Sequence, residues 1–333
     1  MNTTFYYRVI KKYILYHLNF NSPVAVNYGI TSRCNLNCNF CLVRKLKFDD
    51  ELSTSQVLRI LDELDNAGVA YLTLTGGEPL LRKDFNEIAK KISEIGISTT
   101  LNTNGTLIRR NNAKLIAKSF DTVRISVDGD EKTHDKIMGK IGCYKKTREG
   151  IKLLWAVNGR KARICTHFTV NEDNVTGMEQ FFKEFNGLSD SISFMPVLEA
   201  GKEFKLFSNK KFLDTWKQLS KTKKLNQSDD MIRHPDLRIG KKYCDAAKLY
   251  YHILPNGLVT PCSNISRKCF LGNLKEESFK SVIIKPLNDN QKKTLEECKG
   301  CFSRCTTEIS MLMRKKPFEL LLDLPNLLRR YKF

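Results

Sequence analysis

The sequence has no apolar run long enough to cross a membrane. A spanning helix needs about 20 apolar residues, and Arg8, Lys11 and Lys12 interrupt the aromatic and aliphatic stretch at the N-terminus. That stretch also lacks the small-residue cleavage site that follows the apolar core of a secretory signal. We therefore expect the chain to act in the cytoplasm.

Glycine, proline and acidic residues are also scarce. With 18 glycines and 9 prolines in 333 residues, a collagen-like or low-complexity chain is excluded, and 41% hydrophobic residues are enough to bury a core. Lys and Arg number 56 against 36 Asp and Glu, a formal charge of +20. Such a surface attracts phosphorylated substrates, nucleic acid or acidic membranes alike, so charge alone leaves the partner open.

Cysteine, by contrast, is abundant. The 11 cysteines are odd in number and the chain is long, so a secreted disulfide scaffold is not expected. All but Cys143 and Cys165 fall into two groups, and thiols grouped this way in a reducing compartment usually bind metal. The first group is Cys34, Cys38 and Cys41, and the second is Cys244, Cys262, Cys269, Cys298, Cys301 and Cys305.

Between residues 24 and 196, short β-rich runs alternate with helical ones. The runs are mostly apolar on both faces, which is typical of parallel strands covered by helices. The alternation predicts an α/β fold, a partial (βα)6 TIM-like barrel, whose chemistry collects at the carboxyl ends of its strands. The predicted strands are 25–31, 71–75, 97–102, 122–127, 163–170 and 191–196, and the predicted helices are 54–67, 85–95, 112–118, 144–156 and 175–185.

The N-terminal cysteines follow the first predicted strand with Cys-x3-Cys-x2-Cys spacing, at the mouth of the predicted barrel. Three thiolates on a short loop can hold three irons of a 4Fe–4S cluster and leave the fourth iron open to another ligand. A structural zinc site usually needs four protein ligands, of which this loop supplies three. The alternative is a zinc knuckle completed by a distant residue.

Polar motifs end the next three predicted strands. Two glycines at a strand end let backbone groups approach a ligand closely. Glu78 offers an anionic acceptor to an ammonium group, and Ser126 and Asp128 can both hydrogen-bond adjacent hydroxyls. Each motif alone would indicate an ordinary turn or a solvated side chain, so their order along the barrel carries the prediction. The motifs are Gly76-Gly77-Glu78-Pro79, Thr103-Asn104-Gly105 and Ser126-Val127-Asp128-Gly129.

With the cysteine loop, these motifs resemble the radical S-adenosylmethionine (radical SAM) superfamily over about residues 24–200. The resemblance implies a 4Fe–4S cluster on the three cysteines, with SAM bound at its open iron. It also implies reductive cleavage of SAM to a 5′-deoxyadenosyl radical that abstracts hydrogen from a peptide or small-molecule substrate, with a flavodoxin or ferredoxin as reductant. The implied SAM site contains Phe40, Gly76, Gly77, Glu78, Pro79, Asn104, Ser126 and Asp128.

One position departs from the family pattern. The family often has Arg-Gly where this chain has Met138-Gly139. If that arginine binds the SAM carboxylate, Lys136, Lys140 or Arg124 could take its place, and the sequence does not decide among them.

The C-terminal cysteines have the spacing Cys244-x12-Gly257-x4-Cys262, then Cys298-x2-Cys301-x3-Cys305. This resembles the auxiliary-cluster region called SPASM or, when shortened, twitch. The resemblance implies one auxiliary 4Fe–4S cluster on Cys244, Cys262, Cys298 and Cys301. Cys305 could replace one of these ligands, and Cys269 is a weaker candidate. The alternative is a four-cysteine zinc site. Residues 251–260 predict a hairpin that turns at Pro255-Asn256-Gly257.

Both ends of the chain combine apolar with basic residues. Such segments are typical of interfacial helices on an anionic membrane, or they dock on the barrel and close its open end. We expect an amphipathic N-terminal segment (1–23), a radical SAM core (24–200), a basic linker (201–243) with a helix at 212–225, an auxiliary-cluster region (244–305) and a basic amphipathic tail (306–333).

A second function class competes with the enzyme. The charge of +20 and the paired cysteines also suit a non-catalytic, zinc-stabilised protein that binds RNA or a membrane. Aromatic residues interleave with the basic linker, but their spacing suits a packed helix face, and we find no defined nucleic-acid site. The ordered strand-end motifs favour the enzyme.

Overall fold

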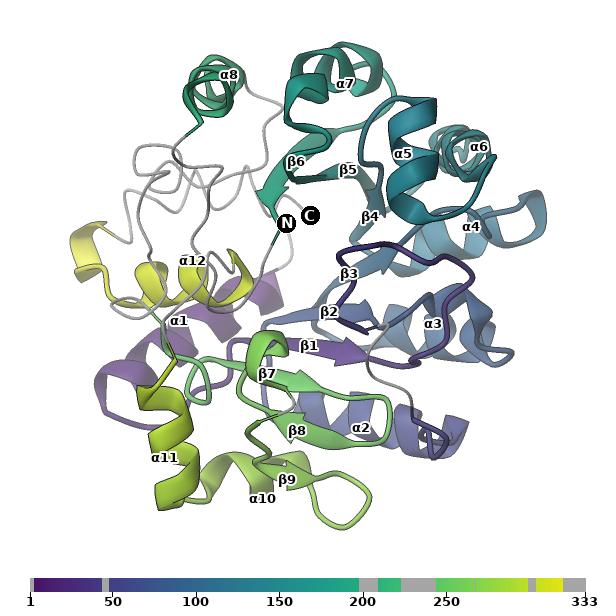
Figure 1. The fold of residues 1–333 in the computed structure, drawn as a ribbon. Coiled ribbons are helices and arrows are strands. Elements are labelled where there is room, and N and C mark those ends of the chain that lie inside the picture. The colour runs from purple at the N-terminus through teal and green to yellow at the C-terminus, as the bar shows by residue number, and fades with distance from the viewer. Residues whose placement is uncertain are drawn as a thin grey trace.

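The computed structural model describes residues 3–43, 48–197, 209–222, 244–266, 268–298 and 304–319. Within these ranges one nine-stranded sheet runs in the order β6-β5-β4-β3-β2-β1-β7-β8-β9 (Figure 1), with β6 and β9 at its edges. The first six strands are parallel to their neighbours and form an open barrel, as predicted. They are β1 (Ala25–Gly29), β2 (Tyr71–Thr75), β3 (Ser98–Thr103), β4 (Thr122–Ser126), β5 (Arg163–Val170) and β6 (Ser191–Pro196).

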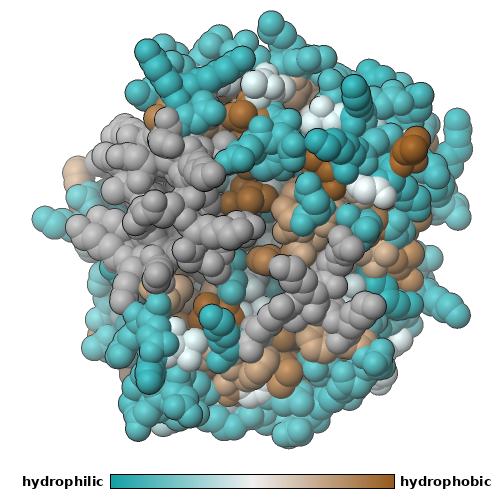
Figure 2. All heavy atoms as spheres, in the orientation of Figure 1, coloured by the Kyte–Doolittle hydropathy of each residue, from teal (hydrophilic) through white to brown (hydrophobic). Residues whose placement is uncertain are grey.

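The helices that connect these strands form the outer layer of the barrel. Five of these helices were predicted to within two residues at most boundaries, although the last begins with a 3-10 turn at Val175–Gly177. On the face of the molecule that Figure 2 shows, hydrophilic side chains cover the rim and hydrophobic ones gather nearer the middle. The helices are α2 (Thr54–Asn66), α3 (Phe85–Glu94), α4 (Arg110–Ser119), α5 (Glu131–Met138), α6 (Cys143–Trp155) and α7 (Met178–Phe185).

Helix α5 was not predicted. It is only eight residues long and contains just two apolar side chains, Ile137 and Met138, which are too few to mark a helix in the sequence. Its ends are nevertheless well defined. The Asp130 side chain accepts a hydrogen bond from the Thr133 backbone N–H, and Gly139 ends the helix in the left-handed region at φ +65°.

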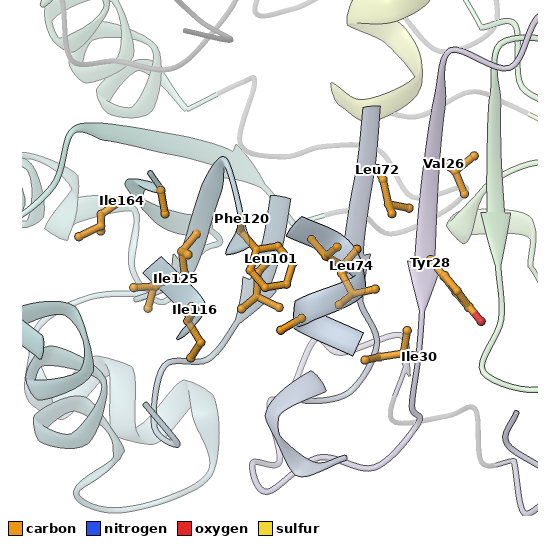
Figure 3. Close-up of a cluster of buried hydrophobic side chains, with 14 of the residues drawn as sticks. Val26, Tyr28, Ile30, Leu72, Leu74, Leu101, Ile116, Phe120, Ile125 and Ile164 are labelled. Atoms are coloured by element: carbon orange, nitrogen blue, oxygen red, sulfur yellow. The ribbon is translucent and has the colours of Figure 1, made fainter. Parts of the chain in front are cut away.

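The two faces of the barrel strands differ, which corrects the prediction that both are apolar. Val26, Tyr28, Leu72, Leu74 and similar side chains are buried between the sheet and the helices (Figure 3). Because side chains alternate along a strand, the residues between them face the concave side of the sheet. Those residues are largely polar, so the concave face is suited to a polar ligand. They include Thr73, Thr100, Asn102, Arg124, Ser126 and His167.

The predicted C-terminal hairpin is confirmed. Strands β7 (Tyr250–Ile253) and β8 (Leu258–Thr260) are antiparallel, and β9 (Gly272–Asn273) pairs with β8. The sequence did not indicate that β7 also pairs in parallel with β1, opposite Ala25 to Tyr28. This pairing joins the cysteine-rich region to the barrel in a single sheet. Helices α10 (Phe279–Ile284), α11 (Asp289–Glu296) and α12 (Arg304–Met313) follow.

The N-terminal helix α1 (Thr3–His17) docks on the barrel. Phe5, Val9 and Tyr13 are buried in one cluster with Met313 of α12, and the Tyr13 hydroxyl donates to the Lys315 carbonyl at 2.7 Å. The opposite face of α1 leaves an apolar stripe in solvent. The exposed residues of this stripe are Tyr7, Ile10 and Ile14, and the exposed Leu18 directly follows the helix.

The linker and tail are described only in part. Helix α8 (Lys210–Ser220) confirms a helix in the predicted 212–225 segment, although it starts two residues earlier. Residues 223–243 and 320–333 lie outside the described residues. Among the helices in the described ranges, none combines the length and apolarity that a membrane crossing requires.

Candidate active site

The N-terminal cysteine loop leaves the carboxyl end of β1 and is held there by Glu51. The carboxylate of Glu51 accepts hydrogen bonds from the Thr31 hydroxyl at 2.8 Å and from the Ser32 backbone N–H at 2.7 Å. These bonds fix the two residues that precede Arg33 and Cys34. No sequence motif marks Glu51, so the sequence did not reveal this anchor.

The two glycines after β2 lie directly against the same loop. The Gly77 N–H donates to the Thr31 carbonyl at 2.7 Å, and the Glu78 N–H donates to the Arg33 carbonyl at 2.8 Å. A Cβ atom on Gly76 would lie 2.3 Å from the Thr31 oxygen, and one on Gly77 would lie 2.2 Å from the Arg33 oxygen. The glycines therefore admit the backbone of the cysteine loop, and their predicted approach to a ligand stays a prediction.

Glu78 is fully buried and joins the ends of β2 and β3. Its carboxylate accepts hydrogen bonds from the Thr103 hydroxyl (2.8 Å), the Asn104 N–H (2.8 Å) and the Leu80 N–H (3.1 Å). Burial raises the pKa of Glu78 to about 7, and these hydrogen bonds act in the opposite direction. A role for this carboxylate in receiving an ammonium group stays a prediction.

Asn104 connects the end of β3 to the cysteine loop. Its side-chain amide donates to the Asn35 side-chain oxygen at 2.9 Å and lies 4.0 Å from the Cys34 sulfur. Asn35 in turn donates to the Thr106 hydroxyl at 2.8 Å. The Cys34 end of the loop is thus attached to the residues that follow β3.

The other end of the loop packs on the last turn of α5. The N–H groups of Asn37 and Asn39 donate to the carbonyls of Met138 (2.9 Å) and Ile137 (3.2 Å). The Cys38 thiol lies 3.1 Å from the Met138 thioether sulfur. The carbonyls at a helix end lack partners within the helix, so the loop satisfies two of them and is held in place.

The residues proposed to substitute for the family's arginine lie in different settings. Lys136 forms an ion pair with Asp173 at 3.2 Å, and Lys140 donates to the Asn35 carbonyl at 3.2 Å. Arg124 lies in the middle of β4, on the concave face of the sheet. Lys140 therefore directly contacts the cysteine loop.

Asp128 is also fully buried, just beyond the end of β4. One carboxylate oxygen accepts from the Thr169 N–H at 2.6 Å, and the other has no partner among the described residues. The Asp128 N–H donates to His134 Nδ1 at 3.1 Å. Burial raises the pKa of Asp128 to about 7. Ser126 is half-buried at the end of β4. Ribose contacts of both residues stay a prediction.

Asp128 should make the stability of the chain fall as the pH rises. Its pKa is raised on folding, so the native state binds the extra proton between about pH 4 and pH 7, and the unfolding free energy decreases over that window. We expect Asp128→Asn to remove this contribution. The unfolding free energy of the variant, relative to that of the unmodified chain, should therefore rise by about 2–3 kcal/mol from pH 5 to pH 8. Urea unfolding of the iron-free, reduced protein at both pH values measures it. If the unfolding free energies of the two proteins change in parallel with pH, Asp128 does not have the raised pKa.

The three thiols suit a cationic iron–sulfur cluster. Cys34 is exposed, and Cys38 and Cys41 are partly exposed. Burial raises the pKa of Cys38 to about 12, and the neighbouring Cys41 and Asp128 add to the effect. Metal coordination stabilises the thiolates that this environment disfavours. Phe40 is partly exposed beside Cys41, and Pro79 is buried at the start of a 3-10 turn. Within the described ranges no three His, Cys, Asp or Glu side chains, those of the cysteine loop included, are already gathered as a metal site, so a cluster would have to draw the three thiols together.

Several C-terminal cysteines gather beside β1 and β7. Cys262 and Cys269 are buried in one cluster with Tyr250 and Ile265, and Cys298 packs against that cluster. Cys244 is partly exposed and is not a member. Cys301 and the Cys305 side chain lie outside the described residues. The packing therefore brings Cys269, the weaker candidate by sequence, next to two predicted ligands.

Two family models match the chain. One describes the radical SAM superfamily and covers residues 28–182, which include the cysteine loop, both glycines and Asp128. Residues 28–182 form a radical SAM domain. The second model, SPASM, describes an iron–sulfur cluster-binding domain and covers residues 244–302. The two matches imply a 4Fe–4S cluster and SAM at the first site and auxiliary iron–sulfur ligation at the second.

Known relatives agree with this radical SAM assignment. The chain is 30% identical over 241 residues to Fe-coproporphyrin III synthase of Methanosarcina barkeri, an alignment that covers 70% of this chain but only 59% of the synthase. It is 27% identical over 308 residues to the sporulation killing factor maturation protein SkfB of Bacillus subtilis, covering 89% of this chain and 72% of SkfB. The crystal structure of Streptococcus suis SuiB bound to S-adenosylmethionine matches with a TM-score of 0.66 at 19% identity, over 91% of this chain and 77% of SuiB. This last likeness shows the fold.

Proposed function

We propose that this chain is a radical SAM maturase that modifies a peptide. SAM, when reductively cleaved, supplies a 5′-deoxyadenosyl radical that removes hydrogen from an unactivated substrate position. The observation that carries the proposal is the cysteine loop, held at the carboxyl ends of β1 to β3 by Glu51, Gly77 and Asn104. The peptide is supported by the long alignment with SkfB, a maturation protein.

The residues of the site divide the work between positioning and binding. Glu78 and Asn104 hold the strand ends and the Cys34 side of the loop in register, which places the three thiols. The second oxygen of Asp128 and the side-chain oxygen of Asn102 are buried acceptors without a partner among the described residues, and either could receive a ligand hydroxyl. The polar concave face, with Asn102 and Arg124, would receive the substrate and keep it beside the cofactor.

The competing function class has less support. A non-catalytic, zinc-stabilised protein that binds RNA or a membrane would not need the radical SAM motifs, which the first family model covers. For the enzyme we propose a flavodoxin or ferredoxin as electron donor. We also retain the division into segments 1–23, 24–200, 201–243, 244–305 and 306–333 as our proposal for its organisation.

Metal analysis tests the proposed cofactors. We expect about eight irons per chain after anaerobic reconstitution, four for each 4Fe–4S cluster. Iron, sulfide and zinc should be measured on the same sample. The proposed auxiliary ligands are Cys244, Cys262, Cys298 and Cys301, with Cys305 or Cys269 as a substitute. Only four irons with stoichiometric zinc would show that the C-terminal site is a structural zinc site.

We further propose that the enzyme is cytoplasmic and associates peripherally with anionic membranes. The apolar stripe of α1, with Lys11 beside it, suits interfacial binding, and each basic residue near the surface adds about 1 kcal/mol. Ile14→Glu should therefore weaken co-sedimentation with anionic liposomes at low salt. Ile284→Glu, at an exposed isoleucine of α10, is the matched control. If the unmodified chain does not sediment with vesicles at low salt, the membrane proposal is wrong.

A further inference from the structure

The corner between α5 and α6 exposes a hydrophobic residue among lysines. Ile141 is 95% exposed, the highest value among the exposed large hydrophobic residues of the described part. It borders an open surface hollow of about 630 Å³. The hollow is lined by Glu131, Lys132, Asp135, Lys136, Gly139, Lys140 and Ile141. We call this surface, together with Lys145, the α5–α6 corner.

The α5–α6 corner lies directly on the cysteine loop. Met138 precedes the corner, and its sulfur lies 3.1 Å from the Cys38 sulfur. Gly139 packs so closely that a Cβ atom there would lie 2.8 Å from the Asn37 carbonyl oxygen. Lys140 donates to the Asn35 carbonyl. A molecule bound at the corner would therefore be separated from Cys38 by little more than the Met138 side chain.

The carboxylates of the corner are already engaged, which leaves it positive. Glu131 pairs with Lys145 at 3.0 Å. Asp135 accepts hydrogen bonds from the Gly142 N–H at 2.5 Å and from the Tyr144 N–H at 2.8 Å. Lys132 and Lys140 have no carboxylate within ion-pair distance among the described residues. The corner thus offers an apolar contact beside two lysines without an ion pair in the described part, Lys132 and Lys140, which suits a brief encounter with a small acidic protein.

We propose that the α5–α6 corner is the docking surface for a small acidic one-electron carrier protein of the flavodoxin or ferredoxin type. The inference rests on the proposed function, because the electron that the carrier delivers would be accepted by the cluster proposed for the cysteine loop. The reduced carrier loses one electron, and the cluster held by Cys34, Cys38 and Cys41 gains it. Positive charge at the corner steers the carrier, and Ile141 is the central contact. Met138 bridges the corner to the loop.

The test is the rate of electron transfer from flavodoxin hydroquinone to the anaerobically reconstituted full chain, followed by flavin absorbance in a stopped-flow instrument. We expect the double variant Lys132→Glu/Ile141→Glu to lower the second-order rate constant about tenfold at low salt and to flatten its salt dependence. Dithionite, which needs no docking, should reduce both proteins equally fast. The matched control, Lys118→Glu/Ile284→Glu, alters exposed residues of α4 and α10 and should behave like the unmodified chain.

Two results would overturn the docking surface. One is a rate from flavodoxin hydroquinone that is the same in the double variant and in the unmodified chain. The case in which neither protein accepts electrons from flavodoxin counts as this result. The other is an equal loss with flavodoxin and with dithionite, which would show that the corner merely positions the loop. Failure of the proposed function looks different, because the unmodified chain would then form no 5′-deoxyadenosine from SAM even with dithionite. If RNA binds the corner and competes with flavodoxin, the surface is a nucleic-acid site and the proposal is wrong.

Discussion

Replacing Cys34, Cys38 and Cys41 together with alanine should reduce 5′-deoxyadenosine formation to the background of the assay. The three thiols are the metal ligands that the loop offers, and without them no iron remains at the carboxyl end of the barrel to bind SAM. The change removes side chains that are exposed or partly exposed, so the fold should persist. Chromatography of the products from SAM and dithionite measures the loss directly.

The controls for this variant concern the other cysteines. The auxiliary site does not depend on the loop, so about four irons per chain should remain after reconstitution. Cys165→Ala, at a buried cysteine of β5 that belongs to neither group, should still cleave SAM. If the triple variant still makes 5′-deoxyadenosine under dithionite, these cysteines do not hold the catalytic cluster.

Gly77→Ala should also cause a large loss, for a steric reason. The new Cβ atom would lie 2.2 Å from the Arg33 carbonyl oxygen, so the backbone before Cys34 has to move. Overpacking of this kind costs about 1–3 kcal/mol of stability. Because a displacement of about 1 Å at a reacting centre can cost about 10²-fold in rate, we expect SAM cleavage to fall by roughly that factor. Urea unfolding and 5′-deoxyadenosine formation measure the two effects.

Gly187→Ala is the matched control for Gly77→Ala. A Cβ atom on Gly187 would meet nothing within 4 Å, and its backbone is not in the left-handed region. Its stability should therefore stay within about 0.5 kcal/mol of the unmodified chain, with unchanged SAM cleavage. If Gly77→Ala behaves like this control, the contact between Gly77 and the cysteine loop does not position the site.

The barrel could be predicted from the sequence because its strands alternate with long periodic helices. Strands β2, β5 and β6 have the predicted bounds, and the other three differ by one or two residues. Helix α5 escaped prediction because eight residues with few apolar positions give no clear period. The pairing of β7 with β1 could not be predicted either, since it joins segments more than 200 residues apart through backbone groups that leave no pattern in the side chains.

The candidate site was predictable where short motifs carry it. The cysteine triplet and the strand-end motifs are local, so their residues could be named from the sequence. The anchors of the loop were not, because Glu51 and Met138 act through tertiary contacts with residues 20 and 100 positions away, which no local motif marks. The grouping of Cys262, Cys269 and Cys298 likewise depends on how the hairpin and the segments after it pack, which cysteine spacing alone does not determine.

Every role proposed for the residues of this chain depends on reductive cleavage of SAM. The most direct measurement is the amount of 5′-deoxyadenosine formed by the unmodified, anaerobically reconstituted protein with SAM, with and without dithionite. We predict that 5′-deoxyadenosine forms with dithionite and stays at background without it. A protein that holds its full complement of about eight irons but forms no 5′-deoxyadenosine with dithionite would contradict the account.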